Sequence, residues 1–150
     1  MRLGEHFSLA EFTRSETATR ERIHNIPSDE DIVRMKYLVS KLLDPLRGTI
    51  AEPIYILSGY RSANLNAAVK GSSTSQHMRG EAADIRVDGF DAKSLAIFIL
   101  SADLPFDQMI WYSPERGGHI HIALSEPKGG EVLYAPPGGG YINQNTLLPK

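Results

Sequence analysis

The chain has 150 residues, no cysteine and a formal net charge of −2 at pH 7, with 41% hydrophobic and 23% charged residues. This length favours one domain with a real core, and scattered charges of both signs speak against a nucleic acid or a membrane as partner. Without thiols there are no disulfides, and His, Asp and Glu remain as the metal-binding side chains. We expect a monomer.

Helical signals dominate the first third of the chain. Ser8 and Glu11 have the spacing of a capping box, which predicts a short helix after Ser8. Ser28, followed by acidic residues, predicts the start of a second helix. Aliphatic residues recur at helical spacing behind it and predict a face that packs on the core. Pro45 is expected to kink or end this helix.

The rest of the chain reads mainly as strands, with two short helices capped by Ser62 and Asp91. Because helices cluster early and strands late, the sequence predicts an α+β fold. An antiparallel β-sheet carries the functional site in this fold, and helices from the N-terminal half flank it. The domain spans 1–150, with a core at about 28–135 and a loosely ordered tail at 136–150. The predicted strands cover residues 53–57, 81–87, 108–112, 119–124 and 131–135.

Strand periodicity brings a carboxylate and two imidazoles to the same side of the predicted sheet. Successive side chains of a strand alternate between its two faces. Asp84 therefore points away from the apolar side of its strand, and His119 and His121 project together from the polar side of theirs. If the two strands are neighbours, Asp84 and one or both histidines converge on one point.

A third imidazole precedes the Asp84 strand. His77 lies in a turn that contains Gly80, which can adopt a backbone conformation that residues with a Cβ resist. Two nitrogen donors and one oxygen donor suit a single zinc ion whose fourth position stays open. An open position is typical of a catalytic metal, because it carries the water that attacks the substrate. The sequence therefore predicts a catalytic zinc site.

The combined pattern closely resembles a known family. S-x-H-x-x-G-x-A-x-D at 75–84, followed by H-x-H at 119–121, is similar to the zinc D-alanyl-D-alanine carboxypeptidase family of peptidoglycan peptidases. That family shares its metal site with lysostaphin-type enzymes and the hedgehog signalling domain. The resemblance covers about 38–124 and includes S-G-Y-R-S at 58–62. F-S-L-A-E-F at 7–12 is similar to small phage-encoded members.

Carried over residue by residue, the resemblance implies that His77, Asp84 and His121 are the zinc ligands. Arg61 matches the arginine expected to face the substrate carbonyl or carboxylate, the alternative being a structural ion pair. Trp111 and Tyr112 either line a substrate groove or pack in the core. The matched positions that support the first ligand and line the site are Ser75 and Gln76.

The pattern offers two candidates for the general base. One branch of the family has a catalytic carboxylate three residues before the last zinc histidine, and here that position is Gly118. His119 and Glu115 are the two possible substitutes. We favour His119, because it shares a face with His121 and imidazole is suited to proton transfer near neutral pH.

The resemblance implies zinc-dependent hydrolysis of a peptide bond in peptidoglycan stem peptides, by a carboxypeptidase or an endopeptidase encoded by a phage or prophage. Residues 1–12 lack the pattern of a secretion signal, so we expect a protein that stays in the cytoplasm until lysis or travels on a virion. The alternative is a virion or cell-wall-binding protein that keeps the fold and metal without turnover. A third reading is a structural zinc domain with His119 as fourth ligand.

Overall fold

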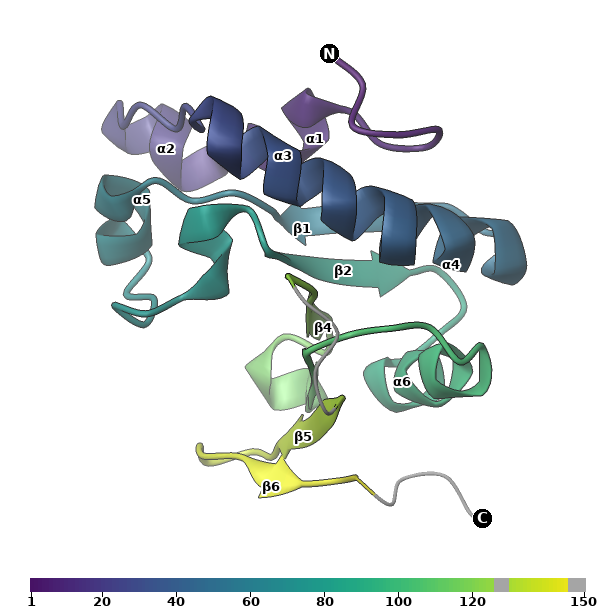
Figure 1. Cartoon of the computed structure of the whole chain (residues 1–150). Coiled ribbons are helices and arrows are strands. Elements are labelled where there is room, and N and C mark those ends of the chain that lie inside the picture. The colour runs from purple at the N-terminus through teal and green to yellow at the C-terminus, as the bar shows by residue number, and fades with distance from the viewer. Residues whose placement is uncertain (126–129, 146–150) are drawn as a thin grey trace.

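The computed structural model of the chain describes residues 1–125 and 130–145 (Figure 1). The helical segments in chain order are α1 (Leu9–Thr13), α2 (Glu16–Glu21), α3 (Asp29–Leu38), the π-helix η1 (Val39–Leu43), α4 (Asp44–Ile50), α5 (Ala63–Ala68), the 3-10 helix η2 (Gln76–Arg79), α6 (Ala92–Ser101) and the 3-10 helix η3 (Pro114–Arg116). The strands are β1 (Ile54–Ser58), β2 (Ala82–Val87), β3 (Gln108–Tyr112), β4 (Ile120–Ala123), β5 (Glu131–Ala135) and β6 (Ile142–Asn143).

The six strands form one sheet in the order β1-β2-β4-β3-β5-β6. All neighbours are antiparallel except β3 and β5, which run parallel. β5 does not form a hairpin with β4 but pairs with β3 on the side away from β4. β3 and β5 both run opposite to β4, so they are parallel to each other. The predicted α+β fold with a mostly antiparallel sheet is confirmed, and this one pair departs from it.

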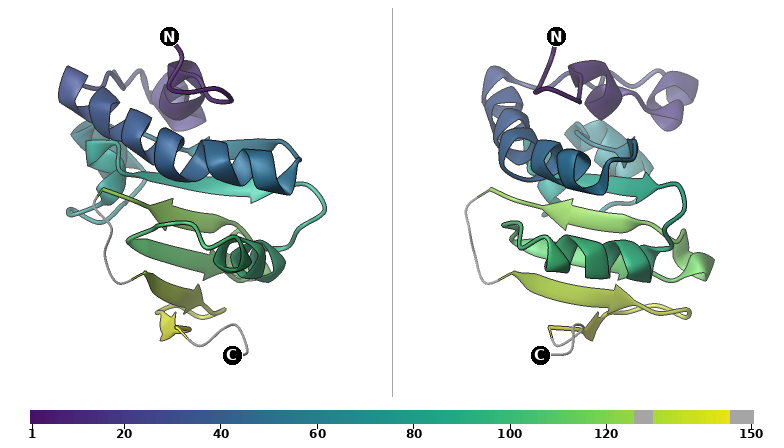
Figure 2. Two further views of the ribbon diagram at one scale, coloured as in Figure 1. Left: turned by 45° about the vertical axis from the view of Figure 1, so that its right-hand side comes forward. Right: turned by 90° about the vertical axis from the view of Figure 1, so that its right-hand side faces the viewer.

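The helices α3, α4 and α6 cover one face of the sheet. The views in Figure 2 place α3 and α4 over the β1 and β2 side and α6 over the middle strands, all on the same face. Alternate strand residues point into this layer, including Ile85, Ile120 and Met109, which are fully buried. The other set of alternate residues, to which Asp84 and His121 belong, therefore lies on the opposite face. That face holds the candidate site.

The predicted helix starts are confirmed by their caps. Ser8 and Ser28 each accept a hydrogen bond from the third residue of their helix, whose own side chain accepts one from the serine N–H in return. Ser62 and Asp91 cap α5 and α6 in the simpler way. A cap satisfies N–H groups that the first helical turn leaves without partners, so these four residues set where the helices begin.

The core begins earlier in the chain than the expected residue 28. Leu3, Phe7 and Phe12 are all buried, and Phe7 and Phe12 meet edge to face with their ring centroids 6.4 Å apart. The N–H of Tyr60 donates to the Phe12 carbonyl oxygen, which ties α1 to the end of β1. The spacing of these three residues follows neither a helical nor a strand period, so the sequence pattern does not reveal this packing in advance.

Pro45 does not end the second predicted helix. The helical path continues to Ile50, but the five residues before Asp44 form a π-helix. Proline has no N–H to donate, and its ring crowds the carbonyl four residues back. A widened π-helical turn is one known way to accommodate such a break.

The tail differs from the expected loose order over the part that the structure describes. Residues 136–145 turn back along β5, and β6 pairs with Leu133 and Tyr134. The Nη1 group of Arg116 donates to the carbonyl oxygens of Gly140 at 2.6 Å and Pro136 at 3.3 Å. A glycine-rich composition does not reveal a distant arginine that holds the segment. Residues 146–150 lie outside the described part.

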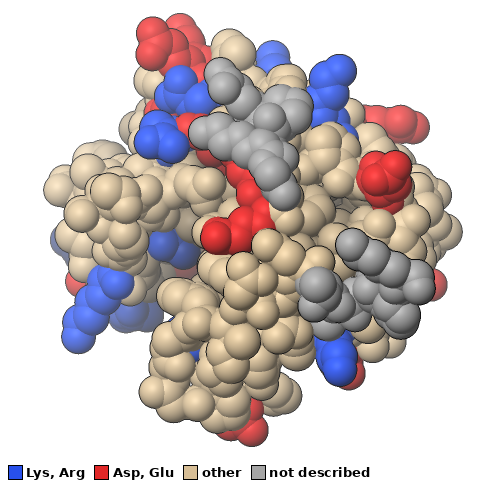
Figure 3. Space-filling model, turned by 60° about the horizontal axis from the view of Figure 1, so that its bottom comes forward, with Lys and Arg blue, Asp and Glu red and all other residues tan. Residues whose placement is uncertain are grey.

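The surface carries charges of both signs. Figure 3 views the molecule from below and shows Lys and Arg side chains interspersed with Asp and Glu among uncharged residues. Within residues 1–125 and 130–145, the helices are all too short or too polar to cross a membrane.

Candidate metal centre

The turn that carries His77 is held from both ends. The Ser75 side chain accepts a hydrogen bond from the His77 N–H at 3.2 Å, and Gly80 ends the turn in the left-handed region with φ 75°. A Cβ on Gly80 would lie 2.6 Å from the Asp31 carbonyl oxygen of α3, so glycine permits both the turn and its contact with the helix. The His77 side chain is buried, and its Nδ1 lies 2.7 Å from the Gly59 carbonyl oxygen.

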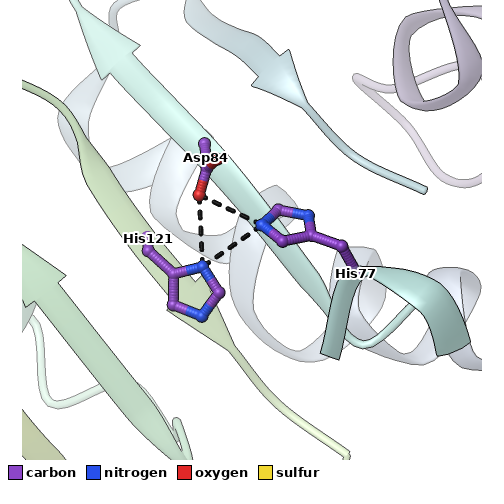
Figure 4. Close-up of side chains that lie close together, drawn as sticks. All are labelled: His77, Asp84 and His121. Atoms are coloured by element: carbon purple, nitrogen blue, oxygen red, sulfur yellow. Dashed lines mark hydrogen bonds and ion pairs between the residues drawn. The ribbon is translucent and has the colours of Figure 1, made fainter. Parts of the chain in front are cut away.

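Asp84 and His121 face each other across two neighbouring strands. They are directly paired in the register of β2 and β4, as the alternation of both strands predicted. The Asp84 Oδ1 atom lies 3.1 Å from His121 Nδ1 and 3.2 Å from His77 Nε2. The two histidine nitrogens are 3.3 Å apart. Figure 4 shows the three side chains pointing toward one another from η2, β2 and β4.

The hydrogen bonds made by the outer nitrogen of each histidine indicate that a cation belongs at the centre of the cluster. A carbonyl oxygen can only accept, so the His77 Nδ1 near Gly59 donates and Nε2 of the neutral ring carries a lone pair. His121 Nε2 lies 3.2 Å from Gln76 Oε1 and donates to it, which leaves a lone pair on Nδ1. Two imidazole lone pairs and a carboxylate oxygen thus converge, and they repel each other unless a positive charge lies between them. The donor set therefore suits a metal ion.

The cluster also keeps Asp84 ionised. Burial by itself raises the pKa of this carboxyl, but a positive charge on His77 or His121 outweighs burial and holds the pKa well below its usual range, and a cation bound at the cluster would act in the same direction. The three donor atoms lie within 4.8 Å of one another, so His77, Asp84 and His121 could hold one metal ion. The structure thus brings together the three residues predicted as ligands.

Arg61 combines the two roles considered for it from the sequence. Its guanidinium lies 3.4 Å from Asp84 Oδ2 and donates to the side chains of Ser58 and Asn66. It also lines the cleft that contains the metal group. A guanidinium held by three partners is fixed in direction, so Arg61 is oriented toward the cleft by structural contacts rather than free to swing.

Gln76 contacts a predicted ligand directly. Its Oε1 accepts from His121 Nε2, while Gln76 and Ser75 both line the cleft. A partner on the second nitrogen of a metal-binding histidine fixes the ring and its tautomer. Gln76 therefore orients His121, a role that sequence reasoning did not assign to it.

We expect Gln76→Ala to weaken zinc binding by about 10- to 100-fold, because the His121 ring and tautomer are no longer held. Competition with a chromophoric chelator measures this affinity. Gln108→Ala is the matched control, because Gln108 lines the same cleft but donates to Glu131. Equal zinc affinity in Gln76→Ala and the wild type would show that Gln76 does not support the site.

The metal group lies in a cleft of about 760 Å³ on the open face of the sheet. Three cationic side chains line it, Arg61, Lys70 and Arg79. Among the lining residues that the structure describes, Asp84 alone carries a carboxylate. The cleft is therefore electropositive apart from the metal group and favours a substrate with negative charge.

The two candidate bases lie differently. The Tyr112 ring, which lines the cleft, stacks on the His119 ring at a centroid distance of 4.5 Å. The Tyr112 N–H donates to the His119 carbonyl oxygen, so the two residues are opposite each other across β3 and the start of β4. Burial lowers the pKa of His119. Glu115 is exposed on η3. Neither His119 nor Glu115 is among the residues that line the cleft, but His119 contacts the lining residue Tyr112.

A family model described as Peptidase M15 matches residues 5–123. The chain belongs to this family. Among curated proteins no match was found. The resemblance inferred from the motif is confirmed at the level of the family, and an M15 peptidase with this His-Asp-His group is a metallopeptidase.

Sequence reasoning missed several residues of this M15 peptidase. Lys70 lines the cleft from a left-handed backbone conformation with φ 59°, for which a lysine gives no signal. Tyr141 lines it from the tail. Glu81 is buried and paired with Arg79. Of the two aromatic residues considered for a groove, Tyr112 lines the cleft, while Trp111 packs against the core, as strand alternation could have indicated.

Proposed function

We propose that this protein hydrolyses a peptide bond in peptidoglycan stem peptides, with one zinc ion held by His77, Asp84 and His121. The observation that carries the proposal is the convergence of two imidazole lone pairs and an ionised carboxylate in an electropositive cleft. Two nitrogen donors and one oxygen donor suit zinc, and a site with three protein ligands retains a position for substrate chemistry.

The cleft supports a peptide that carries free carboxylates. Arg61 and Lys70 line it together with Arg79, and guanidinium groups bind carboxylates in a bidentate manner. Stem peptides contain acidic residues and, when uncrosslinked, a terminal carboxylate. We therefore propose that these cations hold the substrate's carboxylates. A free terminal carboxylate bound at Arg61 would make the enzyme a carboxypeptidase, and a chain continuing past Arg61 would make it an endopeptidase.

Arg61 and Gln76 have separate roles beside the metal in this hydrolysis. When bound, zinc would polarise the substrate carbonyl and lower the pKa of its water. Arg61, fixed by Ser58, Asn66 and Asp84, is aimed to stabilise negative charge on the substrate. Gln76 keeps the His121 ring in place.

A side chain must also take a proton and pass it to the leaving amine. We assign this step to His119, which directly precedes β4, two residues before His121, and stacks on the cleft residue Tyr112. Burial and the neighbouring Tyr141 raise the pKa of Tyr112, so its hydroxyl stays protonated and can donate to the substrate. Glu115 would have to leave its exposed position to act instead.

We expect the purified protein to release peptides or D-alanine from peptidoglycan in zinc and to release none after chelation, with His119→Ala lowering the rate about 10²- to 10⁴-fold. Mass spectrometry of the products measures the release and names the bond. A His119→Ala variant with full activity would remove His119 from the mechanism.

The setting that we propose is a phage or prophage product that acts as a monomer on the cell wall. A second candidate function is a wall-binding protein without turnover. Gly118 supports it, because the position that carries a carboxylate in one branch of the family has no side chain here. Tight zinc binding without product from several types of cell wall would favour this second function.

A further inference from the structure

One wall of the metal cleft comes from the chain beyond the family match. The match ends at residue 123, yet Leu133 and Tyr141 line the cleft together with the metal group. Leu133 lies on β5 and Tyr141 directly precedes β6. We call residues 136–143 the C-terminal ribbon.

The C-terminal ribbon is held in place by several contacts with the rest of the domain. Arg116 donates to two of its carbonyl oxygens, at Gly140 and Pro136, and the Ser113 N–H donates to the Ala135 carbonyl oxygen just before it. β6 closes the far end on β5. A segment with these contacts is a fixed wall.

The aromatic rings at this wall are arranged around Arg116. Its guanidinium lies 5.4 Å from the Tyr112 ring centroid and 5.3 Å from that of Tyr141. The two tyrosine rings meet edge to face with their centroids 6.5 Å apart. Tyr112 is covered by His119 on one side, whereas Tyr141 remains 54% exposed. Among the described residues of the cleft, Tyr141 therefore offers the more exposed aromatic ring.

We propose that the C-terminal ribbon is a substrate-binding wall, in which Tyr141 packs against an uncharged part of the bound peptide. The Arg116 guanidinium beside the Tyr141 ring repels a cationic group of the substrate, and the negative face of the aromatic ring repels a carboxylate. An aliphatic side chain or the peptide backbone remains as the group that Tyr141 accepts. The cations on the other lining elements take the carboxylates. This inference rests on the proposed function and adds a determinant of specificity to it.

The experiment compares Tyr141→Ala with the wild type on soluble tetrapeptide and pentapeptide stems. We expect KM and the product inhibition constant to rise roughly 3- to 10-fold, with kcat within about twofold, because the ring contributes binding and no chemistry. Arg116→Gln, which frees the ribbon, changes KM in the same direction, and the double variant is less than additive.

Tyr55→Ala is the matched control. Tyr55 is an exposed tyrosine on β1 with the Arg86 guanidinium 4.3 Å from its ring centroid, and it is not among the residues lining the cleft. Its KM is expected to stay at the wild-type value. If the wild type cleaves the peptides and Tyr141→Ala keeps the same KM, the C-terminal ribbon does not bind substrate through Tyr141, and the proposed function stands. If the wild type neither cleaves nor binds them, both proposals fail.

Discussion

Replacing His121 with alanine is expected to abolish zinc binding and peptidase activity together. The substitution removes one of the three donor atoms, so only His77 Nε2 and Asp84 Oδ1 remain to bind the metal. A catalytic metal supplies several kcal/mol of transition-state stabilisation, and each 1.36 kcal/mol is a factor of ten in rate. We therefore expect kcat/KM to fall by about 10³-fold or more. Zinc content after dialysis, measured by mass spectrometry of the metal, and product release from peptidoglycan test the two effects separately.

His24→Ala is the control for this variant. His24 is exposed and lies outside the metal group, so zinc content and activity should both stay at wild-type values. His121 lies on the open face of the sheet, and its removal leaves the helix-covered core untouched. Stoichiometric zinc in His121→Ala would exclude His121 as a ligand. Loss of zinc in His121→Ala, beside a wild type that binds zinc tightly but releases no product, would instead support the wall-binding function.

The metal group was predictable from the sequence because its geometry follows from strand alternation. Asp84 and His121 each lie on the polar face of a strand whose other face is apolar. When the two strands pair, their polar faces lie on the same side of the sheet and the two residues come close together. The caps at Ser8 and Ser28 were predictable for a similar reason, since capping depends on residues three positions apart. Local periodicity is sufficient for these features.

The remaining features depend on contacts between distant segments. β5 pairs with β3 because the chain crosses the sheet before β5 begins. The sequence of β5 does not indicate which strand it pairs with. The contact between Gln76 and His121 joins residues 45 positions apart. Tyr141 enters the cleft because Arg116 and the pairing of β6 with β5 hold the ribbon, whereas a Pro-Gly-rich stretch by itself predicts loose order. Spacing along the chain carries no signal for any of these.

Gly80 provides the second large expected effect. It combines a positive φ of 75° with a Cβ position only 2.6 Å from the Asp31 carbonyl oxygen and 2.9 Å from the Met35 side chain. Left-handed backbone costs a residue with a Cβ about 1–2 kcal/mol, and a contact this close to backbone forces the turn away from α3. We expect Gly80→Ala to lower the free energy of unfolding by about 3 kcal/mol or more. Urea unfolding in the presence of a chelator measures this without the contribution of bound metal.

Gly89→Ala separates the two causes, because Gly89 has a similar φ of 85° but nothing within 4 Å of its Cβ position. It should lose only about 1–2 kcal/mol, the cost of the backbone conformation. The excess loss in Gly80→Ala then measures the contact with α3. Since His77 lies in the same turn, that variant should also bind zinc more weakly, while Gly89→Ala should bind it normally. Equal losses of stability in the two variants would mean that the turn does not depend on its contact with α3, and the structural reason for a glycine three residues after His77 would be φ alone.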